Sequence, residues 1–136
     1  MILMHLNYLA IAVSALAYFA LGAIYFNPNV MGKAWMEEHK LGNPTEEDKK
    51  GMGKMMATTF LYCLIACIFL GAFVKIIHPA SMMVGAKIGV ACGAFATMSI
   101  AMSYLYTKKS FKIVMIDSAY HVIGLAIAAV IQTAWQ

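Results

Sequence analysis

The sequence predicts an all-α integral membrane protein in which four transmembrane helices form an antiparallel bundle. Apolar residues make up 62% of the 136 residues and charged residues only 12%, whereas typical soluble domains are about half apolar and about a quarter charged. Four segments reach the roughly 20 apolar residues that a helix needs to cross a bilayer. The length suits a single domain over residues 1–136.

The predicted spans are the four longest apolar stretches, at about residues 6–26, 55–77, 82–106 and 113–135. Backbone polar groups in lipid have to be satisfied within their own segment, so each stretch is expected to be a helix. Short turns at residues 78–81 and 107–110 join the second span to the third and the third to the fourth. Such short connections require neighbouring helices to run antiparallel.

The loop at residues 27–53 is the only long polar connection. Pro28 ends the first span, because the residue before a proline disfavours helical geometry. Gly32 allows a sharp turn, and a short amphipathic helix on the membrane surface can follow, with Gly42 as its stop. Thr45 is a favourable N-cap, followed by acidic residues that suit a helix start. The second long helix should begin there and project from the membrane before entering it.

The third span contains a row of small residues spaced by four: Gly85, Gly89 and Gly93. Small residues at this spacing allow another helix to approach closely. The spacing does not identify the partner helix. We favour packing within the same chain over packing against a second copy.

Asp117 and His121 lie four residues apart in the fourth span and therefore share one helix face. This face should point into the bundle or toward a partner, with Lys33 or Lys54 as the expected neighbour of Asp117. One interpretation is a proton relay or an ion site, because ionisable residues inside membranes are often functional. The other, slightly favoured because the pair lies near the lysine-rich boundary, is a structural clasp that joins helices.

All ten basic residues are lysines, and eight of them lie in or beside the first and third loops. By the positive-inside rule these loops are cytoplasmic and both termini lie outside. The lysines are interpreted as topology signals, so the formal charge of +4 does not indicate a nucleic-acid partner. The eight residues are Lys33, Lys40, Lys49, Lys50, Lys54, Lys108, Lys109 and Lys112.

Motifs of known enzyme classes are absent from the sequence, including phosphate-binding loops, H-E-x-x-H and G-x-S-x-G. The four histidines are dispersed and do not form the three- or four-ligand set that a metal site generally needs. Three cysteines inside apolar runs argue against a disulfide framework. We therefore expect no enzymatic activity, no metal and no cofactor.

The stretch GAIYFNPNVMGKAWM, residues 22–36, resembles the opening signature of the domain of unknown function 1761 family of small bacterial membrane proteins. A second similarity is IDSAYHVIG with a later AW, within residues 116–135. This sequence departs at YFNPNVMG, where members more often have Trp-Tyr-Ser-Pro and a Phe before the Gly. The resemblance covers nearly the whole chain. It implies a four-helix protein of the bacterial cytoplasmic membrane and no assigned activity.

Both motifs fall at the predicted cytoplasmic boundary. Aromatic side chains settle at such interfaces, and the polar residues of the two motifs are expected to meet there. This polar cluster is either a binding site or a structural lock on the first loop. Its candidate members are Tyr25, Asn27, Lys33, Trp35, Asp117, Tyr120 and His121.

Two classes of function remain open. The favoured one is a structural or accessory subunit that packs through small-residue helix faces in a homo-oligomer or a larger membrane complex. The alternative is a small oligomeric transporter or channel in which the face of Asp117 and His121 moves protons or solute. Four spans are few for a path through one chain, so the alternative requires at least a dimer. The expected partners are the lipid bilayer and other membrane subunits.

Overall fold

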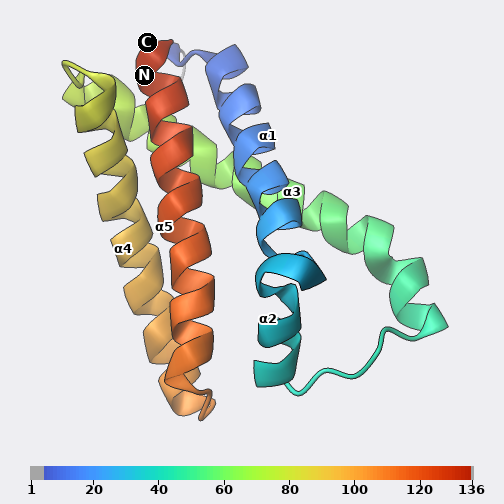
Figure 1. The fold of residues 1–136 in the computed structure, drawn as a ribbon. Coiled ribbons are helices and arrows are strands. Elements are labelled where there is room, and N and C mark those ends of the chain that lie inside the picture. The colour runs from blue at the N-terminus through green and yellow to red at the C-terminus, as the bar shows by residue number, and fades with distance from the viewer. Residues whose placement is uncertain (1–4, 136) are drawn as a thin grey trace.

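The computed structural model describes residues 5–135, so residues 1–4 and 136 of the predicted domain lie outside the described part. Within that part the chain is helical and has no strand (Figure 1). Four helices are long and apolar enough to cross a membrane: α1 (Tyr8–Tyr25), α3 (Glu46–Ile77), α4 (Met82–Tyr106) and α5 (Phe111–Ala134). Between α1 and α3 lie a π-helical turn, η2 (Pro28–Gly32), and the short helix α2 (Lys33–Glu38).

Each long helix begins after a polar side chain that accepts a hydrogen bond from a backbone N–H of its first turn, as good N-caps do. The start of α3 at the predicted N-cap is confirmed. There the Thr45 hydroxyl accepts from the Asp48 N–H at 3.2 Å, and the Asp48 carboxylate accepts from the Thr45 N–H at 2.7 Å. The four capping residues are Asn7, Thr45, Ser81 and Ser110.

The predicted end of the short surface helix is wrong. It was expected at Gly42, but α2 ends at Glu38, and Lys40 takes the left-handed conformation with φ of 55°. The physical reason is a left-handed cap at Lys40, where the Leu41 N–H donates to the carbonyl of Met36 at 3.0 Å and closes the helix before Gly42 is reached. Gly32 is required for space, because a Cβ there would lie 2.1 Å from the carbonyl oxygen of Phe26.

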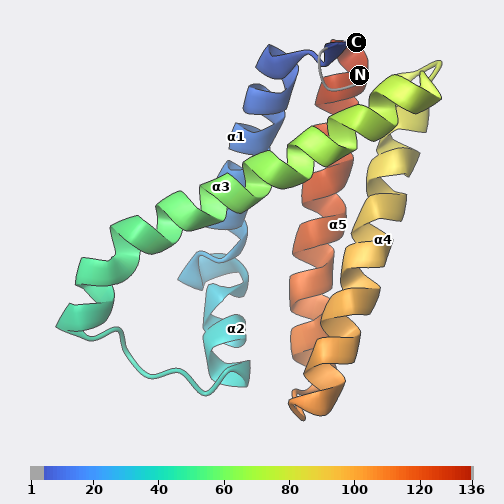
Figure 2. The ribbon, with the colours of Figure 1, turned by 180° about the vertical axis from the view of Figure 1, so that it is seen from behind.

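The helices are arranged less regularly than the expected bundle. α4 and α5 lie side by side and run in opposite directions, and α1 lies on the other side of α5 (Figure 1). α3 crosses α1 and α5 at an oblique angle, in front of them in the view of Figure 2, and its first half diverges from them. Both termini lie at one end of the molecule, and α2 lies at the other.

α5 is the central helix of the fold. In its most apolar stretch 56% of the residues are buried inside the chain, against 11% for α4, which packs mainly on α5. The core where α1, α3 and α5 meet is built from small and branched side chains, including Ile11, Ala15, Cys67, Leu70, Ala128 and Ala129. α5 therefore carries the residues to which the other helices are attached.

The small-residue row of α4 faces α5 of the same chain. Gly85, Gly89 and Gly93 are all buried. A Cβ at Gly89 would lie 2.3 Å from the carbonyl oxygen of Leu125, and one at Gly93 would lie 2.6 Å from the Cα of Val122. These two glycines bring the helix backbones into direct contact.

Candidate functional site

A buried carboxylate on α5 joins three helices near the end of the molecule that carries α2. Asp117 is only 8% exposed. Its Oδ1 accepts a hydrogen bond of 2.9 Å from the indole N–H of Trp35 on α2. Its Oδ2 accepts one of 2.6 Å from the hydroxyl of Tyr104 on α4. Each oxygen thus has a hydrogen-bond donor, which offsets the cost of burying this polar group.

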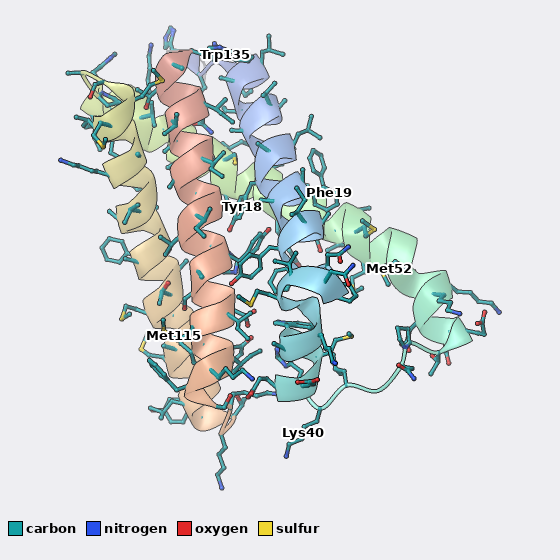
Figure 3. The ribbon with its side chains drawn as sticks, in the orientation of Figure 1. Tyr18, Phe19, Lys40, Met52, Met115 and Trp135 are labelled. Atoms are coloured by element: carbon teal, nitrogen blue, oxygen red, sulfur yellow. The ribbon has the colours of Figure 1, made fainter. Side chains whose placement is uncertain are left out.

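His121 and the tyrosines extend this contact toward α1. The Tyr18 hydroxyl lies 2.5 Å from Nδ1 of His121, and Tyr18 occupies the space between α1 and α5 (Figure 3). Gly124 makes room for it, since a Cβ there would lie 2.2 Å from the Tyr18 ring. The Tyr25 hydroxyl donates to the carbonyl of Ile116 at 2.9 Å. With the Tyr120 hydroxyl, which donates to the carbonyl of Tyr18 at 3.4 Å, three tyrosine hydroxyls tie α1 to α5.

Aromatic rings fill the space between these hydrogen bonds. Tyr120 packs against Phe26 with ring centroids 5.1 Å apart, and Phe26 packs against Trp35 at 5.6 Å. Trp35 in turn lies 4.4 Å from the ring of His39. We call the whole group the aromatic cluster: Tyr18, Tyr25, Phe26, Trp35, His39, Tyr104, Asp117, Tyr120 and His121.

The end of α2 is attached to the start of α5 by polar contacts. The Ser110 hydroxyl donates to the Glu38 carboxylate, and the Lys112 ammonium lies 3.1 Å from Glu38 Oε1. The Lys109 ammonium donates to His39 Nδ1 at 3.3 Å. The hydrogen bond from Ser110 and the contacts with Lys112 hold the pKa of the Glu38 carboxyl below its usual value. The contact therefore favours ionised Glu38.

Acidification should loosen α2 from α5. Because docking lowers the pKa of Glu38, its ionised carboxylate stabilises the docked state at pH values above the usual glutamate pKa of about 4.3. This stabilisation is lost as the pH falls through the lowered pKa. Trp35 reports docking once Trp135 is replaced by Phe, because the chain has two tryptophans. We expect the Trp35 emission to shift to the red below about pH 4. Glu38→Gln should remove this pH dependence; an unchanged titration in that variant would contradict the assignment.

The structure brings five of the seven candidate residues into the aromatic cluster: Tyr25, Trp35, Asp117, Tyr120 and His121. The other two lie elsewhere. Asn27 is exposed and accepts a hydrogen bond from the Asn29 N–H at 3.0 Å. Lys33 is exposed as well. The expected lysine neighbour of Asp117 is wrong: its partners are the neutral donors of an indole and a phenol.

Two members of the cluster, Tyr18 and Tyr104, were missed from the sequence. Both had a signal in helical spacing. Tyr18 lies seven residues before Tyr25 and hence on the same face of the first helix. Tyr104 lies eleven residues, close to three helical turns, after Gly93, so it shares the face that meets α5. Among residues 5–135 no group of three or more His, Cys, Asp or Glu side chains is placed to hold a metal ion.

Comparison with known proteins gives one match. The family described as protein of unknown function (DUF1761) matches residues 9–133, which is almost the whole chain. No curated protein and no solved structure matches this chain.

Proposed function

The chain belongs to the DUF1761 family, as its sequence motifs indicated, and on this premise we propose that it is an integral membrane protein with a structural or accessory role. α1, α3, α4 and α5 cross the bacterial cytoplasmic membrane as an antiparallel set. The role is that of a subunit in a homo-oligomer or a larger membrane complex. No catalytic step is part of the proposal.

The distribution of charge supports this placement. The lysine-rich loops lie at the end of the molecule that carries α2, and the termini lie at the other end (Figure 1). The positive-inside rule then places α2 in the cytoplasm and both termini outside. The 32 residues of α3 span about 48 Å, against about 30 Å of hydrocarbon. Oblique crossing and a projecting polar start both accommodate this excess.

The two hydrogen bonds that the Asp117 carboxylate accepts are the observation that carries the structural role. Each of its oxygens accepts from a neutral donor on a different helix, so the group works as a clasp between α2, α4 and α5. The cavity of about 350 Å³ beside Trp35 has mainly apolar walls, including Phe19, Met55 and Met56. An ion or proton path would need polar or hydrated surroundings there.

The alternative is an oligomeric transporter that uses Asp117 and His121. It is favoured by one observation, the hydrogen bond between Tyr18 and His121, which continues the ionisable groups toward α1. The polar row is interrupted along α5, because Leu125 and Ala128 separate His121 from Gln132, the next polar residue on that face. Transport therefore requires a path completed by a second copy.

Partner contacts have to use faces that the fold leaves open. The small-residue row of α4 is occupied by α5, so it is not available to another subunit. The outer face of α4 is exposed and apolar instead, with Phe95, Met98, Met102 and Leu105 along it. Methionine-rich faces adapt well to a partner helix. We assign this face to the subunit contact.

Gentle extraction combined with reconstitution tests the proposal. We expect native mass spectrometry to find the 14.8 kDa chain in an assembly larger than a monomer. In liposomes that contain a pH-sensitive dye, the protein should add no proton flux beyond that of protein-free vesicles. Asp48→Asn is the matched control, because it makes the same change outside the cluster. The structural role fails if the wild type conducts protons, if Asp117→Asn abolishes this flux, and if Asp48→Asn preserves it.

A further inference from the structure

A second polar site lies at the opposite end of the molecule from the aromatic cluster. A partly open cavity of about 240 Å³ is lined by the ends of α1, α3 and α5 and by the residues just before α1, next to the termini. Trp135, which marks this end in Figure 3, forms part of its wall. The polar residues of the wall are His5, Asn7, Lys75 and Gln132. None of them takes part in the aromatic cluster.

Gln132 carries an unsatisfied acceptor at this cavity. Its side chain is only 4% exposed, yet Oε1 has no hydrogen-bond partner. Both amide hydrogens are used: Nε2 donates to the Ser14 hydroxyl at 2.7 Å and to the carbonyl of Cys67 at 3.0 Å. The Ser14 hydroxyl itself donates to the carbonyl of Ile11, so it can only accept from Gln132. The orientation of the amide is thereby fixed, with the bare oxygen directed away from these partners.

Gly71 lies directly beside this buried oxygen. A Cβ at this position would lie 2.9 Å from Gln132 Oε1, and Gly71 is itself part of the cavity wall. A side chain at this position would therefore crowd the acceptor and cover it from the cavity side. An acceptor that is buried without a partner is costly, so a donor from a bound molecule would satisfy a group that the chain leaves open.

A positive charge belongs to the same cavity wall as this acceptor. Lys75 follows Gly71 by four residues on α3 and belongs to the same wall. Among residues 5–135 the ion pairs join Lys49 to Glu46 and Lys112 to Glu38, so Lys75 has no carboxylate partner there. The six acidic residues of the sequence lie in α2, the first turn of α3 and the first half of α5, toward the other end.

We propose that this cavity binds a small organic anion that carries a hydroxyl or ammonium donor beside its acidic group. The anion pairs with Lys75, and the donor bonds to Gln132 Oε1. Lysine is a point charge and lacks the planar fork of arginine, so it pairs with acidic groups of different shapes. The acidic group of the ligand is therefore either a carboxylate or a phosphate. The volume is that of about eight waters, which suits a small hydroxy acid or a glycerophosphate headgroup. The ligand comes from the aqueous phase or from a lipid such as phosphatidylglycerol.

Calorimetry on the full chain in neutral detergent, with L-lactate as the probe, tests the aqueous source. Lys75→Gln should weaken lactate binding about tenfold or more, as loss of a charged hydrogen bond does. Lys87→Gln, a matched change of an exposed lysine on α4, should leave it unchanged. Propionate, which lacks the hydroxyl, should bind more weakly than lactate. Gly71→Ala should reduce lactate binding by narrowing the space before Oε1, with thermal unfolding as the check on folding.

Native mass spectrometry tests the lipid source in parallel. The wild type should retain phosphatidylglycerol in preference to phosphatidylcholine, and Lys75→Gln should lose this preference while Lys87→Gln keeps it. Either lactate binding or headgroup retention with this dependence on Lys75 supports the site. The proposal is overturned if neither probe binds, if both lysine variants behave like the wild type, or if propionate binds as tightly as lactate.

Discussion

Replacing Gly89 by alanine is expected to lower the free energy of unfolding by about 2–3 kcal/mol, the cost of overpacking a tight contact. The added Cβ would lie 2.3 Å from the carbonyl oxygen of Leu125 and 2.6 Å from the Cα of Ala126. Both are backbone atoms of α5, so no side-chain rotation can relieve the clash. α4 has to move away from α5, and its other contacts along the row weaken together. Denaturant unfolding in micelles, followed by circular dichroism, measures the change.

The other glycines provide controls for this effect. Gly53→Ala makes the same chemical change in α3, where nothing lies within 4 Å of the new Cβ. It should leave stability unchanged or raise it by up to about 1 kcal/mol, because alanine favours a helix interior. Gly85→Ala should also destabilise the protein, because the Thr133 hydroxyl at 2.2 Å can rotate away but the Thr133 Cβ at 2.8 Å cannot. Equal stability of Gly89→Ala and Gly53→Ala would refute the close packing of α4 on α5.

Local signals in the sequence predicted the ends and faces of most helices. The N-cap at Thr45 and the buried row at Gly85, Gly89 and Gly93 depend on neighbouring residues alone, so spacing is sufficient to find them. The oblique crossing of α3 was not predicted, because hydropathy gives the length of a span and not its angle to its neighbours. The early end of α2 was missed because Lys40 takes the left-handed cap position that glycine usually fills, so Gly42 was the expected stop.

The candidate site was predicted from the depth of each residue in the membrane and from the helix face on which it lies. These two features locate a residue, but they do not identify its hydrogen-bond partner. Trp35 and Asp117 were placed at the same boundary, and they form a direct hydrogen bond. A charge was expected to meet a lysine, but Tyr104 occupies the second oxygen of Asp117. Lysine at a boundary can reach water, whereas a phenol buried on the same face needs an acceptor. The more buried donor therefore occupies the carboxylate.

Asp117→Ala should release α2 from the bundle and lower the free energy of unfolding by about 2 kcal/mol. The change leaves the indole N–H of Trp35 and the hydroxyl of Tyr104 without their acceptor, and each unmet buried donor costs about 1–3 kcal/mol. We take the lower part of that range, because hydrogen bonds between membrane helices average about 0.6 kcal/mol in double-mutant cycles. Unfolding in micelles measures the loss, and the emission of Trp35 in a Trp135→Phe background reports whether α2 has left α5.

A double-mutant cycle separates the clasp from a merely tolerated charge. Trp35→Phe keeps most of the ring packing with Phe26 and His39 but removes the N–H that donates to Asp117. If the bond holds α2, Trp35→Phe and Asp117→Ala should each destabilise the protein. The double variant should then be about 0.5–1 kcal/mol more stable than the sum of the two single losses of unfolding free energy predicts. Asp117→Asn retains one acceptor oxygen and should lie between the wild type and Asp117→Ala. Strict additivity of the two changes would mean that the carboxylate does not hold the helix, and the structural role proposed for it would lose its support.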